Sequence, residues 1–367
     1  MNKTQVKRNG AVDLMSFVFC IVLILADFAA QFKTVSFKHF TFFAEGRVAV
    51  DFFLLVAGAL TAASAKRHTD GTLVKQTRDF MGRRLLRILP YHLIVFCVAF
   101  VWFLYQNRHL APDYLVDGII KLLPNLFFIQ KTGLKEAELL PLEWWIAGLL
   151  WMLLLIYPLV LRFKGYFTKI AAPFLAVLLI GYIAHETGEL GNVDAFLYLD
   201  TVSKVYLRCF AGLCGGVFAY EMACGLQKLR FTKLDRVLLT GAELLAYGVT
   251  LLYMCYDFPA RYEPYAFYAL FFGVMLTFSH QSVLADVLDN QATTLLGKSV
   301  LPLYFGHMLP LLLLDLPFIR HRRYSVKLLF VLAVTVILAG IAELAVRFMM
   351  KKIAFRSHSR YNKSENQ

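Results

Sequence analysis

Asp27 stands at the far end of an apolar run in the stretch FCIVLILADFAAQF, residues 19–32, and the eleven residues from Ser16 to Ala26 before it carry no charge. Asp13 lies fourteen residues earlier, close to four helical turns, and Ser16 lies close to three turns before Asp27, so all three share one helix face. An ionisable group within a membrane helix indicates a functional site. An acid at the end of such a helix is also tolerated at the water interface, and the sequence leaves both interpretations open.

Three arginines are candidates for binding an anionic substrate. Arg84 and Arg87 are three residues apart in FMGRRLLRILP, so they lie on one helix face. Paired arginines suit the capture of phosphate, but they are equally typical of anchors that extend to lipid headgroups. Arg208 opens a helix that contains Gly212 and Gly216, and we group it with the other two as a candidate for binding a cofactor.

Four further residues belong to the predicted site. His307 lies in an apolar run between two prolines, where it could shuttle protons or be a buried histidine with satisfied nitrogens. Asp51 opens a run of small residues that predicts either close helix packing or the thin wall of a substrate cavity. Glu143 precedes Trp144 at the start of an apolar run, where tryptophans are typical of the aromatic belt at a membrane interface.

The composition predicts a membrane protein. Hydrophobic residues make up 59% of the 367 residues, whereas about 45–50% is usual for soluble domains. Several runs of about 20 residues are long enough to cross a bilayer as helices. We therefore expect an all-α, polytopic membrane helical bundle. We predict ten spans, at residues 11–31, 47–65, 86–106, 143–162, 167–185, 201–222, 237–256, 263–281, 299–316 and 326–349.

The loops predict the orientation. Lysine and arginine concentrate in the loops that are cytoplasmic if the N-terminus is inside, although the segment 319–327 is a basic exception. An even number of spans then places both termini of a multi-pass cell-membrane protein in the cytoplasm. We expect residues 1–350 to form the transmembrane domain and the basic segment 351–367 to be an unstructured tail. Residues 113–130 are too polar for a span and predict an interfacial helix.

Other partners are not expected. The net charge of +13 is explained by the loops, and no soluble segment carries the basic stripe with aromatic residues that is typical of nucleic-acid binding. The six cysteines lie in or near apolar runs without a C-x-x-C spacing, so they predict helix packing rather than disulfides or a metal site. Membrane lipid is the partner that we expect around the helical bundle.

The order and spacing of several short blocks resemble acyltransferase family 3, the integral-membrane O-acyltransferases that modify bacterial glycans and related acceptors. The resemblance extends over nearly the whole chain. The matching residues are Arg8, Asp13, Leu14, Val50, Asp51, Phe52, Phe53, Gly58, Arg84, Arg87, Pro90, Trp144, Trp145, Arg208, Gly212, Gly216, Leu296, Gly297, Tyr304 and His307.

Three positions depart from the family pattern. Ser16 stands where the family has an arginine, Ala57 where it has a serine, and Asp27 where it has the histidine regarded as catalytic. The resemblance implies transfer of an acetyl or other short acyl group from acyl-CoA, bound from the cytoplasm, to a hydroxyl of a glycan or lipid-linked saccharide. The departures keep open an alternative, a non-catalytic relative that serves as a membrane scaffold or as an acyl or glycolipid transporter.

Overall fold

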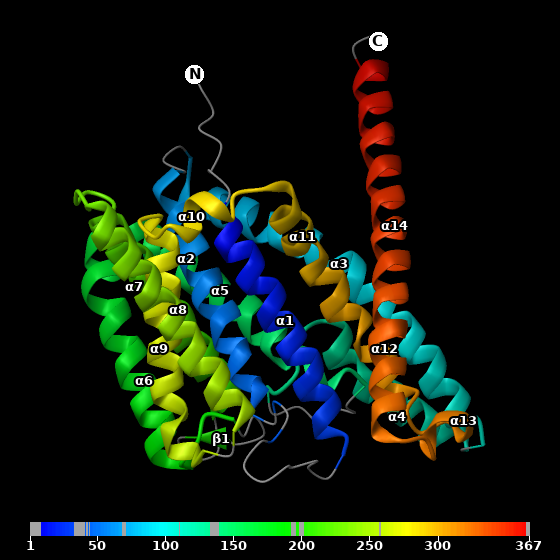
Figure 1. Ribbon diagram of the computed structural model, residues 1–367. Coiled ribbons are helices and arrows are strands. Elements are labelled where there is room, and N and C mark those ends of the chain that lie inside the picture. The colour runs from blue at the N-terminus through cyan, green and yellow to red at the C-terminus, as the bar shows by residue number, and fades with distance from the viewer. Residues whose placement is uncertain are drawn as a thin grey trace.

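The computed structural model is a bundle of long helices that run side by side (Figure 1). The structure describes residues 9–32, 41, 43, 45–67, 71–109, 111–132, 139–191, 196–197, 202–256 and 258–364, without the side chains of residues 141, 196–197 and 349–364. Arg8 and residues 365–367 lie outside this part of the chain.

Ten long helices and several short elements make up the described chain. The long helices are α1 (Gly10–Ala30), α2 (Ala49–Arg67), α3 (Leu73–Gln106), α5 (Trp144–Tyr166), α6 (Ala172–Thr187), α7 (Lys204–Leu226), α8 (Lys233–Cys255), α9 (Glu263–Ser279), α11 (Gln291–Gly306) and α14 (Tyr324–Ser364). The short elements are η1 (Gly46–Val48), α4 (Pro112–Leu126), η2 (Pro141–Glu143), η3 (Phe167–Ala171), the antiparallel pair β1 (Phe196–Leu197) and β2 (Val202–Ser203), η4 (Ala260–Tyr262), α10 (Leu284–Val287), α12 (Met308–Leu312) and α13 (Pro317–Arg320).

The structure confirms a polytopic all-α bundle. Among the described residues, eight helical stretches are long and apolar enough to cross a membrane. Seven of them each correspond to one predicted span, and the eighth, Trp144–Thr187, contains both the fourth and the fifth. The predicted span 263–281 corresponds to α9, which is 17 residues long.

The chain reverses direction within the long stretch that contains α5 and α6. Lys164 has φ 39° and ψ −122°, a conformation that interrupts the helix. Trp145 at the start of α5 accepts a hydrogen bond through its carbonyl from Cys209 Sγ at 3.8 Å. Thr187 at the end of α6 receives one from Lys204 Nζ at 2.9 Å. Because Cys209 and Lys204 both lie at the start of α7, α5 and α6 are antiparallel, as two separate spans require.

Helices α2 and α7 approach backbone to backbone. A Cβ atom on Gly216 would lie 1.9 Å from the carbonyl oxygen of Leu55, and one on Gly58 would lie 2.2 Å from that of Leu213. Such close approach of two helices is possible only where one of the two facing residues is a glycine, which has no side chain. The small residues of α2 therefore pack against a neighbouring helix, and Ala62 near the end of α2 also lines a cavity, so both interpretations of this stretch hold in part.

Helix α1 lies along α11 in the same direction (Figure 1). Asp13 meets Gly297 near the start of both helices, and Cys20 Sγ donates to the carbonyl of Val300 at 3.5 Å further along. The polar face predicted for α1 thus follows α11, and Asp27 arrives beside the end of that helix. Ser16 on the same helix is half-buried.

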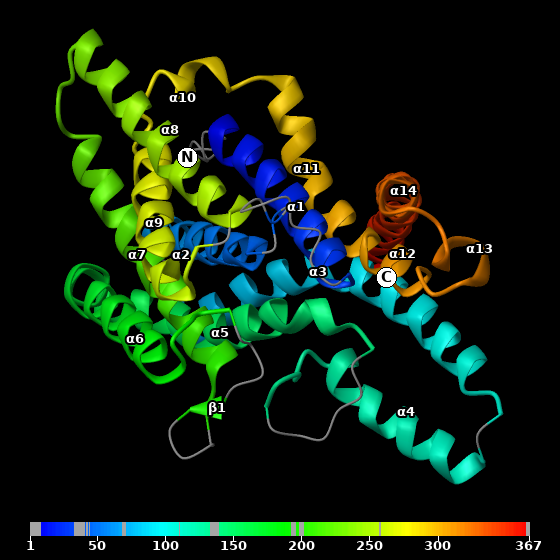
Figure 2. The ribbon, with the colours of Figure 1, turned by 60° about the horizontal axis from the view of Figure 1, so that its bottom comes forward.

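The periphery differs in part from the sequence prediction. Helix α14 continues to Ser364 and projects beyond the bundle at the end where α1 begins (Figure 1), so the segment expected to be unstructured is helical as far as that residue. No proline or glycine after Gly340 interrupts it. Helix α4 lies at the edge of the bundle (Figure 2), in the segment predicted to be an interfacial helix.

We expect Gly216→Ala to destabilise the protein, because its new methyl group would overlap the backbone of α2. Overpacking typically costs about 1–3 kcal/mol. Thermal unfolding in detergent measures the effect. The control is Gly241→Ala on α8, where no heavy atom lies within 4 Å of the added Cβ. Equal melting temperatures for both variants would contradict this packing.

Candidate active site

Asp27 and His307 form a buried pair. Oδ2 of Asp27 lies 3.2 Å from Nε2 of His307, and the two side chains are 7% and 0% exposed. The other ring nitrogen, Nδ1, faces the backbone carbonyl of Tyr304. A carbonyl only accepts hydrogen bonds, so Nδ1 carries a proton. Nε2 is consequently the nitrogen that shares a proton with Asp27, and of the two side chains only Asp27 retains any exposed surface.

This pair can act together as a base. A proton arriving at the free oxygen of Asp27 can be matched by transfer of the shared proton to His307, which would leave an imidazolium beside a neutral carboxyl group. The sequence predicted both residues as candidates, but only the fold brings them together across 280 positions of the chain.

His92 and Glu143 form a second pair in the same region. Nδ1 of His92 lies 3.0 Å from one carboxylate oxygen of Glu143, and Nε2 lies 3.3 Å from the carbonyl of Leu126. Both side chains are fully buried, and the His92 ring lies 4.1 Å from that of Phe128. The carbonyl of Leu126 only accepts hydrogen bonds, so Nε2 carries a proton and Nδ1 shares another with Glu143. This pair therefore holds a second buried proton.

Tyr304 links the two pairs. Its hydroxyl accepts a hydrogen bond from Trp145 Nε1 at 2.6 Å and donates to the carbonyl of Leu142, the residue before Glu143. Its own carbonyl contacts His307. Trp145, and Trp144 beside it, are buried within the bundle. Trp145 therefore supports the polar cluster, a role that the prediction of an aromatic belt did not include.

A cavity of about 280 Å³ adjoins this cluster at the end of the bundle opposite to the start of α1. Leu142 and Met308, which neighbour Glu143 and His307 in the sequence, contribute to its wall. Its remaining lining mixes two aromatic residues, two amides and a carboxylate with aliphatic side chains. These residues are Gln31, Trp102, Phe103, Gln106, Leu139, Leu140, Leu311, Leu312 and Asp315. A small polar molecule in this cavity would contact Met308, which follows His307, although neither Asp27 nor His307 is part of the wall.

Arg208 is part of a buried ion network. Its Nε and Nη2 donate to the two oxygens of Asp51 at 2.9 Å each, and Nη1 donates to the carbonyl of Leu190 at 2.9 Å. Glu263 lies 3.7 Å from the same guanidinium and accepts from the backbone of Leu190 and Gly191. The prediction that Arg208 binds a cofactor does not fit this arrangement, since its donors are already occupied in holding α2, α7 and α9 together.

The other predicted residues are spread along the bundle. Arg84 is half-buried, with its guanidinium 4.7 Å from the Phe80 ring centre and Nη2 3.5 Å from Thr61 Oγ1, whereas Arg87 is exposed. Asp13 lies far along α1 from Asp27 and meets Gly297. Neither these arginines nor Asp13 contacts the Asp27–His307 pair.

The family assignment rests on a match over most of the chain. The family model described as an acyltransferase domain, that of acyltransferase family 3, matches residues 9–344. The chain belongs to acyltransferase family 3. Comparison with curated proteins gave no significant match, and comparison with solved structures gave none either. Membership supports a multi-pass membrane acyltransferase in general terms.

Two features of this acyltransferase were not predicted from the sequence. The pairing of His92 with Glu143 depends on a contact across 51 positions of the chain. The bidentate pair of Arg208 with Asp51 spans 157 positions. The sequence signal for the second pair is that Arg208 and Asp51 each stand at the start of an apolar run. Charges buried in a helical bundle must be paired, but the sequence does not say with which partner.

We expect Asp51→Asn to destabilise the protein by about 3–5 kcal/mol, because it leaves the buried Arg208 without its carboxylate. Chemical unfolding in detergent, followed by intrinsic fluorescence, measures this loss. The double variant Asp51→Leu with Arg208→Leu removes both charges and should recover most of the stability. A single variant as stable as the parent protein would contradict the proposed role of the ion pair.

Proposed function

We propose that this protein transfers an acetyl or other short acyl group from acyl-CoA to a hydroxyl of a glycan or lipid-linked saccharide. Family membership supports the acyltransferase reaction. The observation that carries the proposal further is the buried Asp27–His307 pair, together with a cavity that is lined by the adjoining Met308 and by aromatic and polar groups. Aromatic rings, amides and carboxylates are groups that stack on a sugar and bind its hydroxyls.

Asp27 takes over the position of the family histidine, and His307 assists it from behind. The acceptor hydroxyl gives its proton to Asp27, whose shared proton moves to His307. The hydroxyl oxygen forms a bond with the acyl carbon, the carbon–sulfur bond of the thioester breaks, and the coenzyme A sulfur leaves with a proton. The products are an ester and coenzyme A with a free thiol. Base assistance of this kind is worth about 10²–10⁴-fold in rate.

Sidedness follows from the same proposal. Helix α1 begins and α14 ends at one end of the bundle (Figure 1), and we assign that end to the cytoplasm because the basic loops gather there. The acyl donor then arrives from this end, and the acceptor binds in the cavity at the opposite end. The protein would lie in the cell membrane with both termini inside.

We expect Asp27→Asn to lower acyl transfer by about 10²–10⁴-fold, because an amide cannot take up the hydroxyl proton. Transfer of label from radiolabelled acetyl-CoA to the cell's own envelope glycan and glycolipid fraction measures it, with release of free thiol as a second readout. Asp117→Asn, at an exposed position of α4, is the control. Activity of Asp27→Asn equal to this control would remove Asp27 from the reaction.

An exchange of the two residues tests their partnership. We expect Asp27→His and His307→Asp each to be poorly active alone, and the double variant to regain at least tenfold over either, because it restores an Asp–His pair with the histidine on α1. The same transfer assay measures all three variants. A double variant no better than the single ones would show that the two side chains do not act together. Complete absence of transfer and of coenzyme A binding in the parent protein would favour the non-catalytic alternative.

A further inference from the structure

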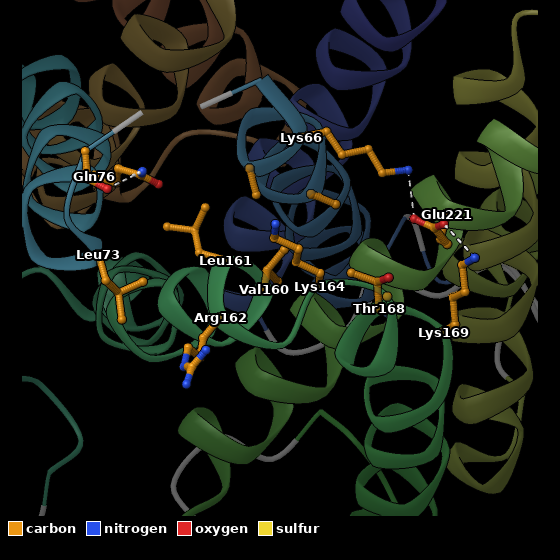
Figure 3. Close-up of a pocket in the computed structure, with 14 residues that line it drawn as sticks. Lys66, Leu73, Gln76, Val160, Leu161, Arg162, Lys164, Thr168, Lys169 and Glu221 are labelled. Carbon is orange, nitrogen blue, oxygen red and sulfur yellow. Dashed lines mark hydrogen bonds and ion pairs between the residues drawn. The ribbon is translucent and has the colours of Figure 1, made fainter. Parts of the chain in front are cut away.

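A second cavity lies at the end of the bundle where α1 begins. Its volume is about 520 Å³, within the range of small-molecule sites. It is bounded by the last turns of α2, α5 and α7, the first turns of α3, and the turn between α5 and α6 (Figure 3). Four cationic side chains and one carboxylate line it, which are Lys66, Arg162, Lys164, Lys169 and Glu221.

The charges in this cavity are unevenly matched. Lys66 and Lys169 both extend to the single carboxylate of Glu221, at 2.8 Å and 3.7 Å (Figure 3). Within the described part of the chain, no carboxylate forms an ion pair with Arg162 or Lys164. Cytoplasmic loops commonly carry such charges for orientation alone. Here they gather around a concave space of ligand size, where their repulsion is relieved best by an anion.

The backbone at Lys164 adds a second observation. Its φ of 39° is unusual for a residue with a side chain, and such strain persists only where the surroundings impose it. Glycine adopts positive φ without this cost. Gly165 follows directly. The glycine of this turn therefore stands one position after the residue with positive φ, and a lysine occupies the strained position itself. A lysine in the strained position places a cation in the cavity wall.

The layer beyond the cavity is aromatic. Phe80 on α3 and Tyr157 on α5 stack with ring centres 3.8 Å apart. They lie one turn further into the bundle than Gln76 and Leu161, which line the cavity. The Tyr157 hydroxyl is buried and has no hydrogen-bond partner among the described residues. Tyr157 is thus a buried polar residue one helical turn beyond the cavity wall, of which it is not a part.

We propose that this cavity binds the phosphates of the acyl donor's nucleotide head. The inference rests on the proposed function and names the part of the protein that holds its donor. Fifteen residues of α5 separate Trp145, beside the polar cluster, from Val160 in the cavity wall, or about 22 Å along the helix. A donor with its phosphates and its thioester at opposite ends of a long flexible arm, as in acyl-CoA, matches two sites so far apart.

The cavity also changes which cations are assigned to the donor. The sequence indicated Arg84 and Arg87, but neither lines this cavity. Arg84 lies one turn beyond the aromatic layer, over Phe80, where it is placed to meet the arm of the donor rather than its nucleotide. Arg162 and Lys164 are the residues whose charges remain available for phosphate.

The test is direct binding of 3′-phosphoadenosine 5′-diphosphate and of free coenzyme A to the purified full-length protein by calorimetry. We expect the double variant Arg162→Gln with Lys164→Gln to bind both at least tenfold more weakly. Lys233→Gln, at an exposed position at the start of α8, is the matched control and should bind as the parent does. Equal affinity of the double variant and this control would overturn the proposal.

A glycine substitution separates binding from folding. We expect Lys164→Gly to raise the melting temperature, because it relieves the positive φ, and at the same time to weaken nucleotide binding at least threefold. Lys164→Arg should keep the affinity because it keeps the charge. If Lys164→Gly binds as the parent protein does, Lys164 has no part in the site.

Two further comparisons identify the source of the anion and the cause of a failure. In nanodiscs with anionic lipid, competition that abolishes nucleotide binding would assign the cavity to lipid headgroups and overturn the inference. Asp27→Asn should still bind nucleotide, since its change lies at the other site. Nucleotide binding that depends on Arg162 and Lys164 without any acyl transfer would sustain the cavity and refute the reaction. Acyl transfer by the double variant with an unchanged KM for the donor would sustain the reaction and refute the role of the cavity.

Discussion

A charge buried among apolar helices must be matched by an opposite charge or by a proton, and this constraint organises the bundle. Arg208 is matched by Asp51 with two hydrogen bonds of 2.9 Å, and this pair ties α7 to α2. His92 and Glu143 join α3 to the start of α5, and His307 and Asp27 join the end of α11 to α1. Burying each pair carries a desolvation penalty, which the attraction between its two members offsets only in one geometry. The pairs together therefore fix which helices are neighbours.

The same constraint separates a structural pair from a reactive one. Arg208 holds its charge permanently, because a guanidinium cannot lose its proton in a protein. A histidine beside a carboxylate shares a proton that can move, and the Asp27 side chain keeps some exposed surface. The Asp27–His307 pair is therefore suited to accept a proton from a substrate, whereas the Arg208–Asp51 pair is suited to hold helices in place.

The departure from the family pattern at Asp27 has a physical explanation in this geometry. A lone aspartate is a weak base, with an ordinary pKa near 3.9. With His307 at 3.2 Å, the carboxylate of Asp27 has a neighbour to which it can pass a proton. The two cavities then lie at opposite ends of the bundle, with the polar cluster between α1, α3, α5 and α11 next to one of them.

The sequence alone determined the class of protein and the candidates. Long apolar runs are typical of membrane helices, and the eight candidate spans among the described residues contain nine of the ten predicted ones, whereas α9 is shorter. Asp27, His307, Glu143 and Asp51 were recognisable because an ionisable residue in an apolar run is rare.

The tertiary structure decided which of these residues meet. Pairings across 51, 157 and 280 positions depend on how helices are placed around one another, and hydropathy is the same for every such arrangement. It also changed Arg208 from a ligand-binding candidate into a structural residue and brought Arg162 and Lys164 together with Lys66 around one cavity. The sequence specifies which charges must be buried or gathered, but only packing specifies the partner that each one finds.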